Sequence, residues 1–354
     1  MDKYQEYWKK RNELMFLQGE KGALGTARDL ERNYRQAITN IEDQINAFYG
    51  KYARTSNLDM SEVRKLLNRS ELKSFKEYLS DIKAYAKQHK LDKNYTNELN
   101  KLSYKLRVSR LEELKTKMQF EVEKLTKQVQ DKVEDTLLKT YEEGYYRTIF
   151  NVQQFFQISS SFTELNLQAI RKAVGTPYML QNYSDVLWKN KENLKYLLDT
   201  AVPQGIILGQ NPNKVAQIAS KKLTSNYKAA VRLIRTEYNL ILNDGASKGY
   251  LEAGIDKYEL LATLDDRTSE ICQDLDGKVF NISQKEVGIN YPPFHPNCRT
   301  TTIPYFESDE FDEDSVRIAR DAYGKNYYVS SKLKYPEWRA GLTKQRDGKV
   351  IYKN

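Results

Sequence analysis

The chain has 354 residues, a formal net charge of +9 and 30% charged residues against 40% hydrophobic ones. Two cysteines cannot supply a disulfide framework, and no uncharged apolar run reaches the ~18 residues that cross a bilayer. The first residues also lack the apolar core of a signal peptide. We therefore expect a folded protein without membrane contact, made in a cytosol and built from about two or three domains.

The first half of the chain has the composition of long helices. Neither Gly nor Pro occurs between Gly50 and Gly144, so nothing there removes a backbone donor or breaks a helical turn. The run Asp59–Glu62 has the spacing of a capping box and predicts the start of a helix that carries Val63, Leu66 and Leu67. A second helical segment is predicted through Leu72, Phe75, Leu79, Ile82 and Tyr85.

The clearest helical pattern follows directly. Apolar residues recur at steps of three and four, at Leu111, Leu114, Met118, Val122, Leu125, Val129, Val133 and Leu137. The pattern predicts a helix over residues 105–143, roughly 55–60 Å long at about 1.5 Å per residue. Its apolar stripe must pack on partner helices, as a bundle or as a coiled-coil stalk. We treat residues 1–204 as one helical N-terminal region.

The second half contains all eight prolines and a different pattern. Asn211 and Pro212 have the order of an N-cap and a first helical residue, a further helix is predicted from about Ser225, and Gly254 suits its end. Segment 201–250 has seven Lys or Arg against two acidic residues, which favours either contact with double-stranded DNA or an ordinary solvated face.

Shorter periodicity follows this helix. Residues 258–264 and 300–303 are predicted strands, and Asp276-Gly277 predicts a tight turn before Val279-Phe280. We infer a mainly α protein in which a small α+β domain, residues 205–306, precedes a C-terminal tail, residues 307–354.

Both cysteines and one of the two histidines lie near one another in sequence, at Cys272, His295 and Cys298. Zinc accepts S, N and O donors in a tetrahedron, so these three could bind a structural zinc with Asp265 or Asp266 as fourth ligand. The alternative is a proline-stiffened loop whose His and Cys are packed or hydrogen-bonded. No zinc-deaminase signature, H-E-x-x-H motif or phosphate-binding loop occurs, so no catalytic or cofactor-binding residue is assigned.

Another polar cluster lies in a helical context at Arg235-Thr236-Glu237. An ion pair within the helix, or one that braces the domain, is the interpretation we favour.

Taken in order, these motifs resemble a known domain. The set is Arg235-Thr236-Glu237, Asp265-Asp266-Arg267-Thr268, Cys272, Leu275-Asp276-Gly277 and Pro292-Pro293-Phe294-His295-Pro296-Asn297-Cys298-Arg299. It resembles the Mu F-like head-morphogenesis domain, which marks minor head proteins of tailed phages. Tyr7-Trp8-Lys9-Lys10-Arg11 and Tyr335-Pro336-Glu337-Trp338 are similar to the opening and closing segments of minor capsid proteins from phages of Gram-positive hosts.

The resemblance implies a virion protein of the capsid interior, assembled in the host cytoplasm. Its implied partners are the portal protein, the DNA and the major capsid or scaffolding protein. Many family members have a cysteine where this chain has Ser269, so this chain has lost a ligand if the family's Cys/His set binds metal. The departure counts against a bound metal and favours a purely structural role for the Cys/His cluster. Because the tail is also short for an enzymatic domain, we predict that the chain is not an enzyme. The alternative is a zinc-dependent hydrolase or nuclease that uses Cys272, His295 and Cys298.

Overall fold

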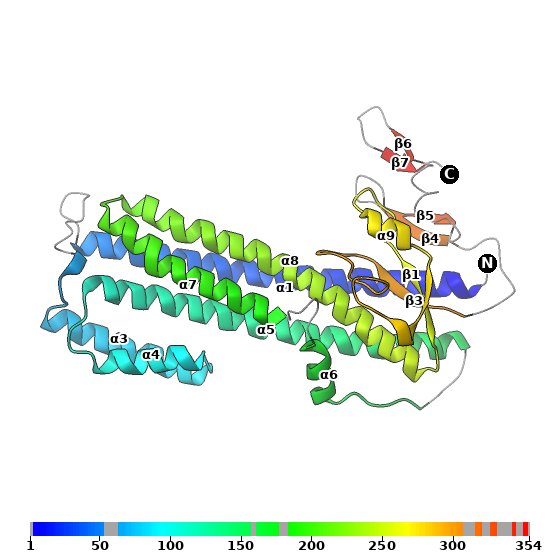
Figure 1. Cartoon of the computed structure of the whole chain (residues 1–354), viewed down its shortest axis with the longest axis horizontal. Helices are drawn as coiled ribbons and strands as arrows, with labels where there is room; N and C mark the ends of the chain where they lie inside the picture. Colours follow the sequence, from blue (N-terminus) through cyan, green and yellow to red (C-terminus); the bar gives the residue numbers. More distant parts are fainter. Residues whose placement is uncertain are drawn as a thin grey trace. The chain divides into compact units, whose positions relative to one another are not determined.

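The computed structural model describes residues 3–52, 63–156, 161–176 and 183–306, together with the backbone of four short strands after residue 315. It is mainly helical with a small antiparallel sheet, which confirms the predicted fold class (Figure 1). The helices are α1 (Lys3–Tyr52), α3 (Arg69–Gln88), α4 (Lys93–Tyr104), α5 (Arg110–Phe156), α6 (Leu167–Val174), α7 (Tyr183–Ile207), α8 (Pro212–Glu252) and α9 (Glu270–Leu275). Among the described residues, no helix is long and apolar enough to span a bilayer.

The sheet has the strand order β2-β1-β3, and both pairings are antiparallel. Its strands are β1 (Lys257–Leu261), β2 (Val279–Asn281) and β3 (Thr301–Pro304). These strands and the turn at Asp276-Gly277 confirm the periodicity argument for this region. Two further antiparallel hairpins pair β4 (Val316–Arg320) with β5 (Asn326–Ser330), and β6 (Leu342–Lys344) with β7 (Val350–Tyr352).

The chain forms two compact units. The sheet unit comprises Met1–Gly25, Glu134–Asn182 and Arg232–Asn354, and the bundle unit comprises Thr26–Val133 and Tyr183–Val231. Each unit therefore combines segments that are distant in sequence, and α1, α5 and α8 each contribute residues to both. The domain boundaries at residues 204 and 306 stay predictions.

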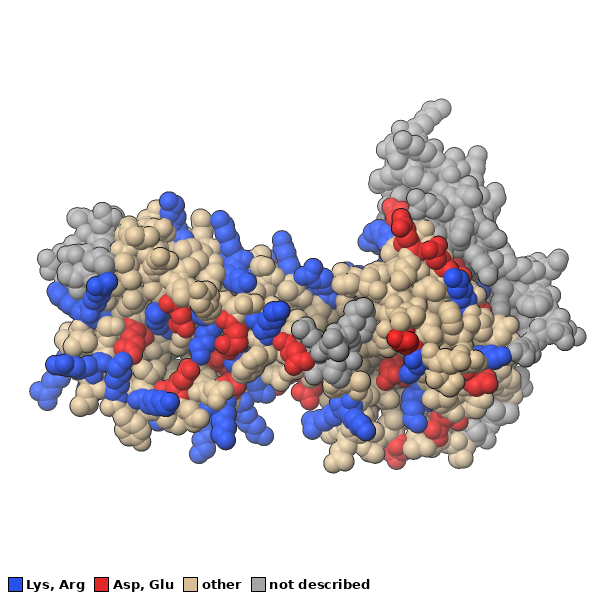
Figure 2. Space-filling view, viewed as in Figure 1, with Lys and Arg blue, Asp and Glu red and all other residues tan. Residues whose placement is uncertain are grey.

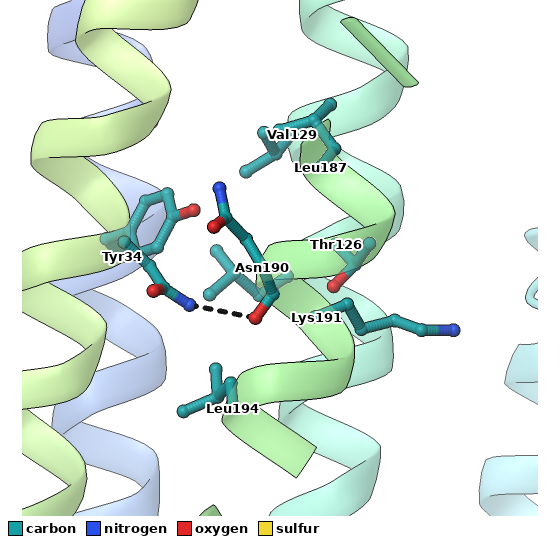
Figure 3. Close-up of a pocket in the computed structure, with 9 residues that line it drawn as sticks. Tyr34, Thr126, Val129, Leu187, Asn190, Lys191 and Leu194 are labelled. Carbon is teal, nitrogen blue, oxygen red and sulfur yellow. Dashed lines mark hydrogen bonds between the residues drawn. The ribbon is translucent and has the colours of Figure 1, made fainter. Parts of the chain in front are cut away.

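The bundle unit packs segments of four helices around an aliphatic interior. Tyr34 of α1 lies 5.7 Å from the Tyr227 ring of α8, and Asn226 of α8 donates to the Asn190 carbonyl of α7. A pocket of about 20 Å³, room for about one water molecule, lies between these helices. Figure 3 shows Tyr34, Val129 and Leu187 around it, whereas Lys191 extends away from it.

Helices α3 and α4 form a hairpin within the bundle unit (Figure 1). The predicted apolar residues of α3 are its buried face, which includes Phe75 and Leu79. Asn68 and Glu71 form a reciprocal capping box, so α3 begins at Arg69. Of the separate helix predicted before it, Val63 is helical, whereas Leu66 and Leu67 are not. Leu66 forms a bridge with Ser109, and the Leu67 amide bonds to the Val108 carbonyl. The capping box predicted at residues 59–62 lies outside the described residues.

Helix α5 begins at Arg110 rather than near residue 105, and it continues past the predicted end at residue 143. It passes through Gly144, where α8 approaches very closely within the sheet unit. A Cβ atom added to Gly245 of α8 would lie 2.4 Å from the Tyr141 carbonyl oxygen. A Cβ atom added to Gly144 would likewise lie 2.5 Å from the Leu242 carbonyl oxygen of α8. Close helix packing therefore requires glycine at position 144, and Gly144 does not end α5.

Helix α8 is continuous from Pro212 to Glu252, although two helices were predicted here. Its start is confirmed, because the Asn211 side chain accepts a hydrogen bond from the Lys214 amide at 2.9 Å. Its end is also confirmed, because Gly254 has a φ of +73° and the Ile255 amide bonds back to the Tyr250 carbonyl.

The core of the sheet unit lies between these helices and the sheet. Trp8, Tyr250 and Tyr258 are among its fully buried side chains. Asn243 is also buried, and its side-chain oxygen accepts hydrogen bonds from the Thr301 hydroxyl and the Thr302 amide. This buried polar contact fixes β3, and with it the loop before β3, against α8.

Candidate functional site

The structure brings Cys272, His295 and Cys298 together. Cys272 lies on α9, and the other two lie on the loop that leads into β3. The Cys272 sulfur is 3.3 Å from His295 Nε2 and 3.8 Å from the Cys298 sulfur. All three potential ligand atoms lie within 4.8 Å of one another. The predicted grouping is therefore present, whereas its occupation by a metal stays a prediction.

A tight turn positions the two ligands from the loop. The Cys298 amide donates to the His295 carbonyl at 3.1 Å, and Asn297 adopts a positive φ of 60°. The Asn297 amide donates to the Thr236 hydroxyl of α8 at 3.0 Å. Thr236 therefore holds the turn at Asn297 in place. The sequence around Thr236 did not indicate this role.

The electrostatics of the cluster favour a thiolate on Cys298. Both cysteines are buried, with 2% exposure each. A hydrogen bond from Cys272, and another from His295, lower the pKa of Cys298 to about 4 despite its burial. The hydrogen bond with Cys298 raises the pKa of His295, and the interaction with Cys298 together with burial raises the pKa of Cys272.

The proposal of Asp265 or Asp266 as the fourth ligand is wrong. Asp265 is buried, and both its carboxylate oxygens accept hydrogen bonds from the Arg299 guanidinium. The Arg267 amide and the Thr268 hydroxyl also donate to Asp265, at 3.0 and 3.1 Å. Asp266 is exposed. The carboxylate of Asp265 therefore joins the loop after β1 to the loop before β3.

Ser269 lies beside the cluster. Its hydroxyl oxygen is buried and has no hydrogen-bond partner of the usual geometry among the described residues. A pocket of about 30 Å³ opens next to it and is lined by Cys272, His295 and Thr300. That volume accommodates one or two water molecules.

The two charged residues of the Arg235-Thr236-Glu237 motif have different surroundings. Arg235 forms an ion pair of 3.1 Å with Glu20 on α1, which braces the sheet unit as the sequence predicted. Glu237 is instead buried, and burial raises its pKa to about 7. Within the described residues we find no ion pair to Glu237.

A second candidate site is a basic stripe on α8, defined as Lys214, Lys221 and Lys228. All three are exposed and follow one another at intervals of seven residues, about two helical turns. No acidic residue occurs between Asp199 and Glu237, so the stripe is not neutralised along its own helix. The sequence count for segment 201–250 indicated the charge, and the helix adds its arrangement on one face.

The chain is similar to one known protein family and to two known proteins. Residues 197–303 match the family model described as Phage Mu protein F like protein. The chain is 26% identical over 222 residues to "Minor head protein GP7" of Bacillus phage SPP1, which covers 58% of this chain and 71% of that protein. It is also 26% identical over 291 residues to "NAD(+)--arginine ADP-ribosyltransferase EFV" of Enterococcus faecalis, or 78% of this chain. No solved structure matches the chain.

These matches confirm the resemblance and correct one prediction. The domain match and the minor head protein support a role in phage head morphogenesis. The prediction that the chain is not an enzyme is contradicted, because one relative is an ADP-ribosyltransferase. The chain spans 57% of that relative's length.

Proposed function

We propose that the chain, whose residues 197–303 match the Phage Mu protein F like family model, is a minor capsid protein that binds the portal inside the procapsid and contacts the packaged DNA. The domain match and the minor head relative support the assembly role. The uneven distribution of charge between the two units supports the contact with DNA.

The bundle unit has 30 Lys or Arg against 19 Asp or Glu, a net charge of +11. The sheet unit has 27 against 29, a net charge of −2. The whole positive excess of the chain is therefore found in the bundle unit, where blue side chains project along α8 in Figure 2. A cationic surface of this kind releases counterions when it binds a polyanion. We assign the DNA contact to the bundle unit and propose that the basic stripe is the main part of the contact surface.

The assignment predicts a specific salt dependence. Replacing Lys214, Lys221 and Lys228 with glutamine removes three phosphate contacts. Each phosphate contact contributes about 0.9 to the slope of log K against log salt concentration. The slope for binding to double-stranded DNA should therefore become less steep by about 2.7. Fluorescence anisotropy of a labelled duplex, titrated at several salt concentrations, measures this slope.

A matched control carries the same change of charge elsewhere in the bundle unit. Lys73, Lys87 and Lys101 are exposed on the α3–α4 hairpin, and their replacement with glutamine should change the slope much less. If both triple variants change the slope equally, DNA binding depends on the net charge of the bundle unit and not on the basic stripe. An unchanged slope in the stripe variant would exclude the stripe from DNA binding.

A second candidate function is the transfer of ADP-ribose from NAD⁺ to arginine, which is favoured by the match to the named transferase. The match covers 57% of that enzyme, so the remaining part has no counterpart in the alignment. Incubation of the purified chain with labelled NAD⁺ and an arginine-containing acceptor tests this function directly. Transfer of label to the acceptor would establish the transferase function, and an acceptor that stays unlabelled would exclude it.

A further inference from the structure

We propose that Cys272, His295 and Cys298 bind one zinc ion, whose fourth position is taken by a water molecule held by Ser269. The ion would join α9 to the loop before β3. This inference rests on the local geometry and is independent of the proposed role in the phage head.

The distances between the ligand atoms fit a tetrahedral zinc. Bonds of about 2.3 Å to sulfur and 2.0–2.1 Å to nitrogen place two sulfurs about 3.8 Å apart, and sulfur and nitrogen about 3.5 Å apart. The structure has 3.8 Å between Cys272 and Cys298, and 3.3 Å between Cys272 and His295. Both distances from Cys272 therefore match a tetrahedral ion closely, and the His295 nitrogen lies within 4.8 Å of the Cys298 sulfur.

The orientation of His295 also suits a ligand. Its Nδ1 donates a hydrogen bond to the Pro296 carbonyl oxygen at 3.0 Å. On metal binding, the ring would keep its proton on Nδ1 and lose any proton on Nε2, whose lone pair would then be directed at the ion. A backbone carbonyl in this position commonly fixes the tautomer and the ring orientation of a metal-binding histidine.

The fourth position is indicated by Ser269 and the pocket beside it. The buried Ser269 hydroxyl interacts with the Cys272 sulfur, and no other partner of hydrogen-bond geometry lies near it among the described residues, so it can also bond to a water molecule. A water molecule in the pocket of about 30 Å³ could bond both to the ion and to this hydroxyl. The ion would thereby hold α9 and the loop before β3 together, with one exchangeable position on the side of the pocket.

Metal content of the full-length chain tests the site. We expect about one zinc ion per chain after expression with zinc and exhaustive dialysis. Cobalt substitution should produce the strong visible bands of a tetrahedral ion and a thiolate-to-metal charge-transfer band. Replacing His295 with asparagine, or Cys298 with serine, should reduce the bound metal to background. His89→Asn is the matched control, because His89 is the other histidine and lies exposed after α3.

A variant that adds a metal ligand tests the site even if the variants that lack a ligand do not fold. Ser269→Cys places a fourth ligand beside the cluster, so it should bind zinc at least tenfold more tightly than the unchanged chain. Ser269→Ala should weaken binding by about tenfold, because it removes the partner of the bound water. Competition with a chromophoric chelator measures both affinities.

Two results would overturn the proposal. One is a folded, reduced chain that retains no metal and shows no cobalt bands. The other is a mass lower by two hydrogens with no free thiol, which would identify a disulfide between Cys272 and Cys298 in place of the metal site.

Discussion

Replacing Asp265 with asparagine is expected to lower the free energy of unfolding by about 3–5 kcal/mol at neutral pH. Asp265 is 1% exposed and accepts two hydrogen bonds from Arg299, which is itself largely buried. Asparagine keeps the shape but removes the charge, so it leaves the guanidinium without compensation. Chemical denaturation, followed by circular dichroism, measures the loss. Asp266→Asn changes the adjacent exposed carboxylate and should leave stability nearly unchanged.

The effect of Asp265→Asn should depend on pH in a defined direction. The pKa of Asp265 lies below its ordinary value, because hydrogen bonds and attraction from Arg299 outweigh the opposing effect of burial. A carboxylate with a lowered pKa contributes stability above its unfolded pKa, and that contribution is lost as the pH falls through the folded pKa. The difference between variant and unchanged chain should therefore shrink in strong acid. A difference that is constant with pH would contradict the ion pair.

Replacing Lys191 with methionine should cost a similar amount, about 3–5 kcal/mol at neutral pH. Lys191 and Glu123 are paired at 3.1 Å with side-chain exposures of 3% and 5%, and the ammonium also lies 3.7 Å from the centre of the Trp188 ring. Burial already raises the pKa of Glu123, and Lys191 opposes that rise. Without Lys191, the buried carboxylate is unpaired, and its penalty should disappear as the pH falls and Glu123 takes up a proton.

Two controls separate this buried pair from ordinary surface charge. Lys195, one helical turn away, pairs with Glu98 in a more exposed position, and Lys195→Met should cost less than about 1 kcal/mol. The double variant Lys191→Met with Glu123→Leu should regain most of the lost stability, because no buried charge is left unpaired. A double variant as unstable as Lys191→Met alone would contradict this account.

Elements with a strong local signal were predicted well. The apolar stripe from Leu111 to Leu137, the Asn211 cap and the strands around Asp276-Gly277 are fixed by local periodicity and backbone preferences. Predictions that depended on distant contacts failed. The length of α5 could not be read from Gly144, because the reason for that glycine is the close approach of α8, about a hundred residues later in the chain.

In the candidate site, too, local sequence features were predicted and contacts between distant segments were not. Sequence proximity and zinc chemistry were sufficient to group Cys272, His295 and Cys298. They were not sufficient to place Asp265, because its partner Arg299 lies on a different loop. The role of Thr236 in holding the Asn297 turn likewise requires the fold, since α8 and that turn are distant in sequence.

The proposed head function is tested most directly by the composition of purified phage heads. With an affinity tag on this chain, heads isolated from an infected culture should contain it together with the portal protein. The variant with glutamine at Lys214, Lys221 and Lys228 should still enter the head, since its altered surface is assigned to DNA. A chain that is abundant in the lysate but absent from purified heads, and that does not co-purify with the portal, would contradict the account.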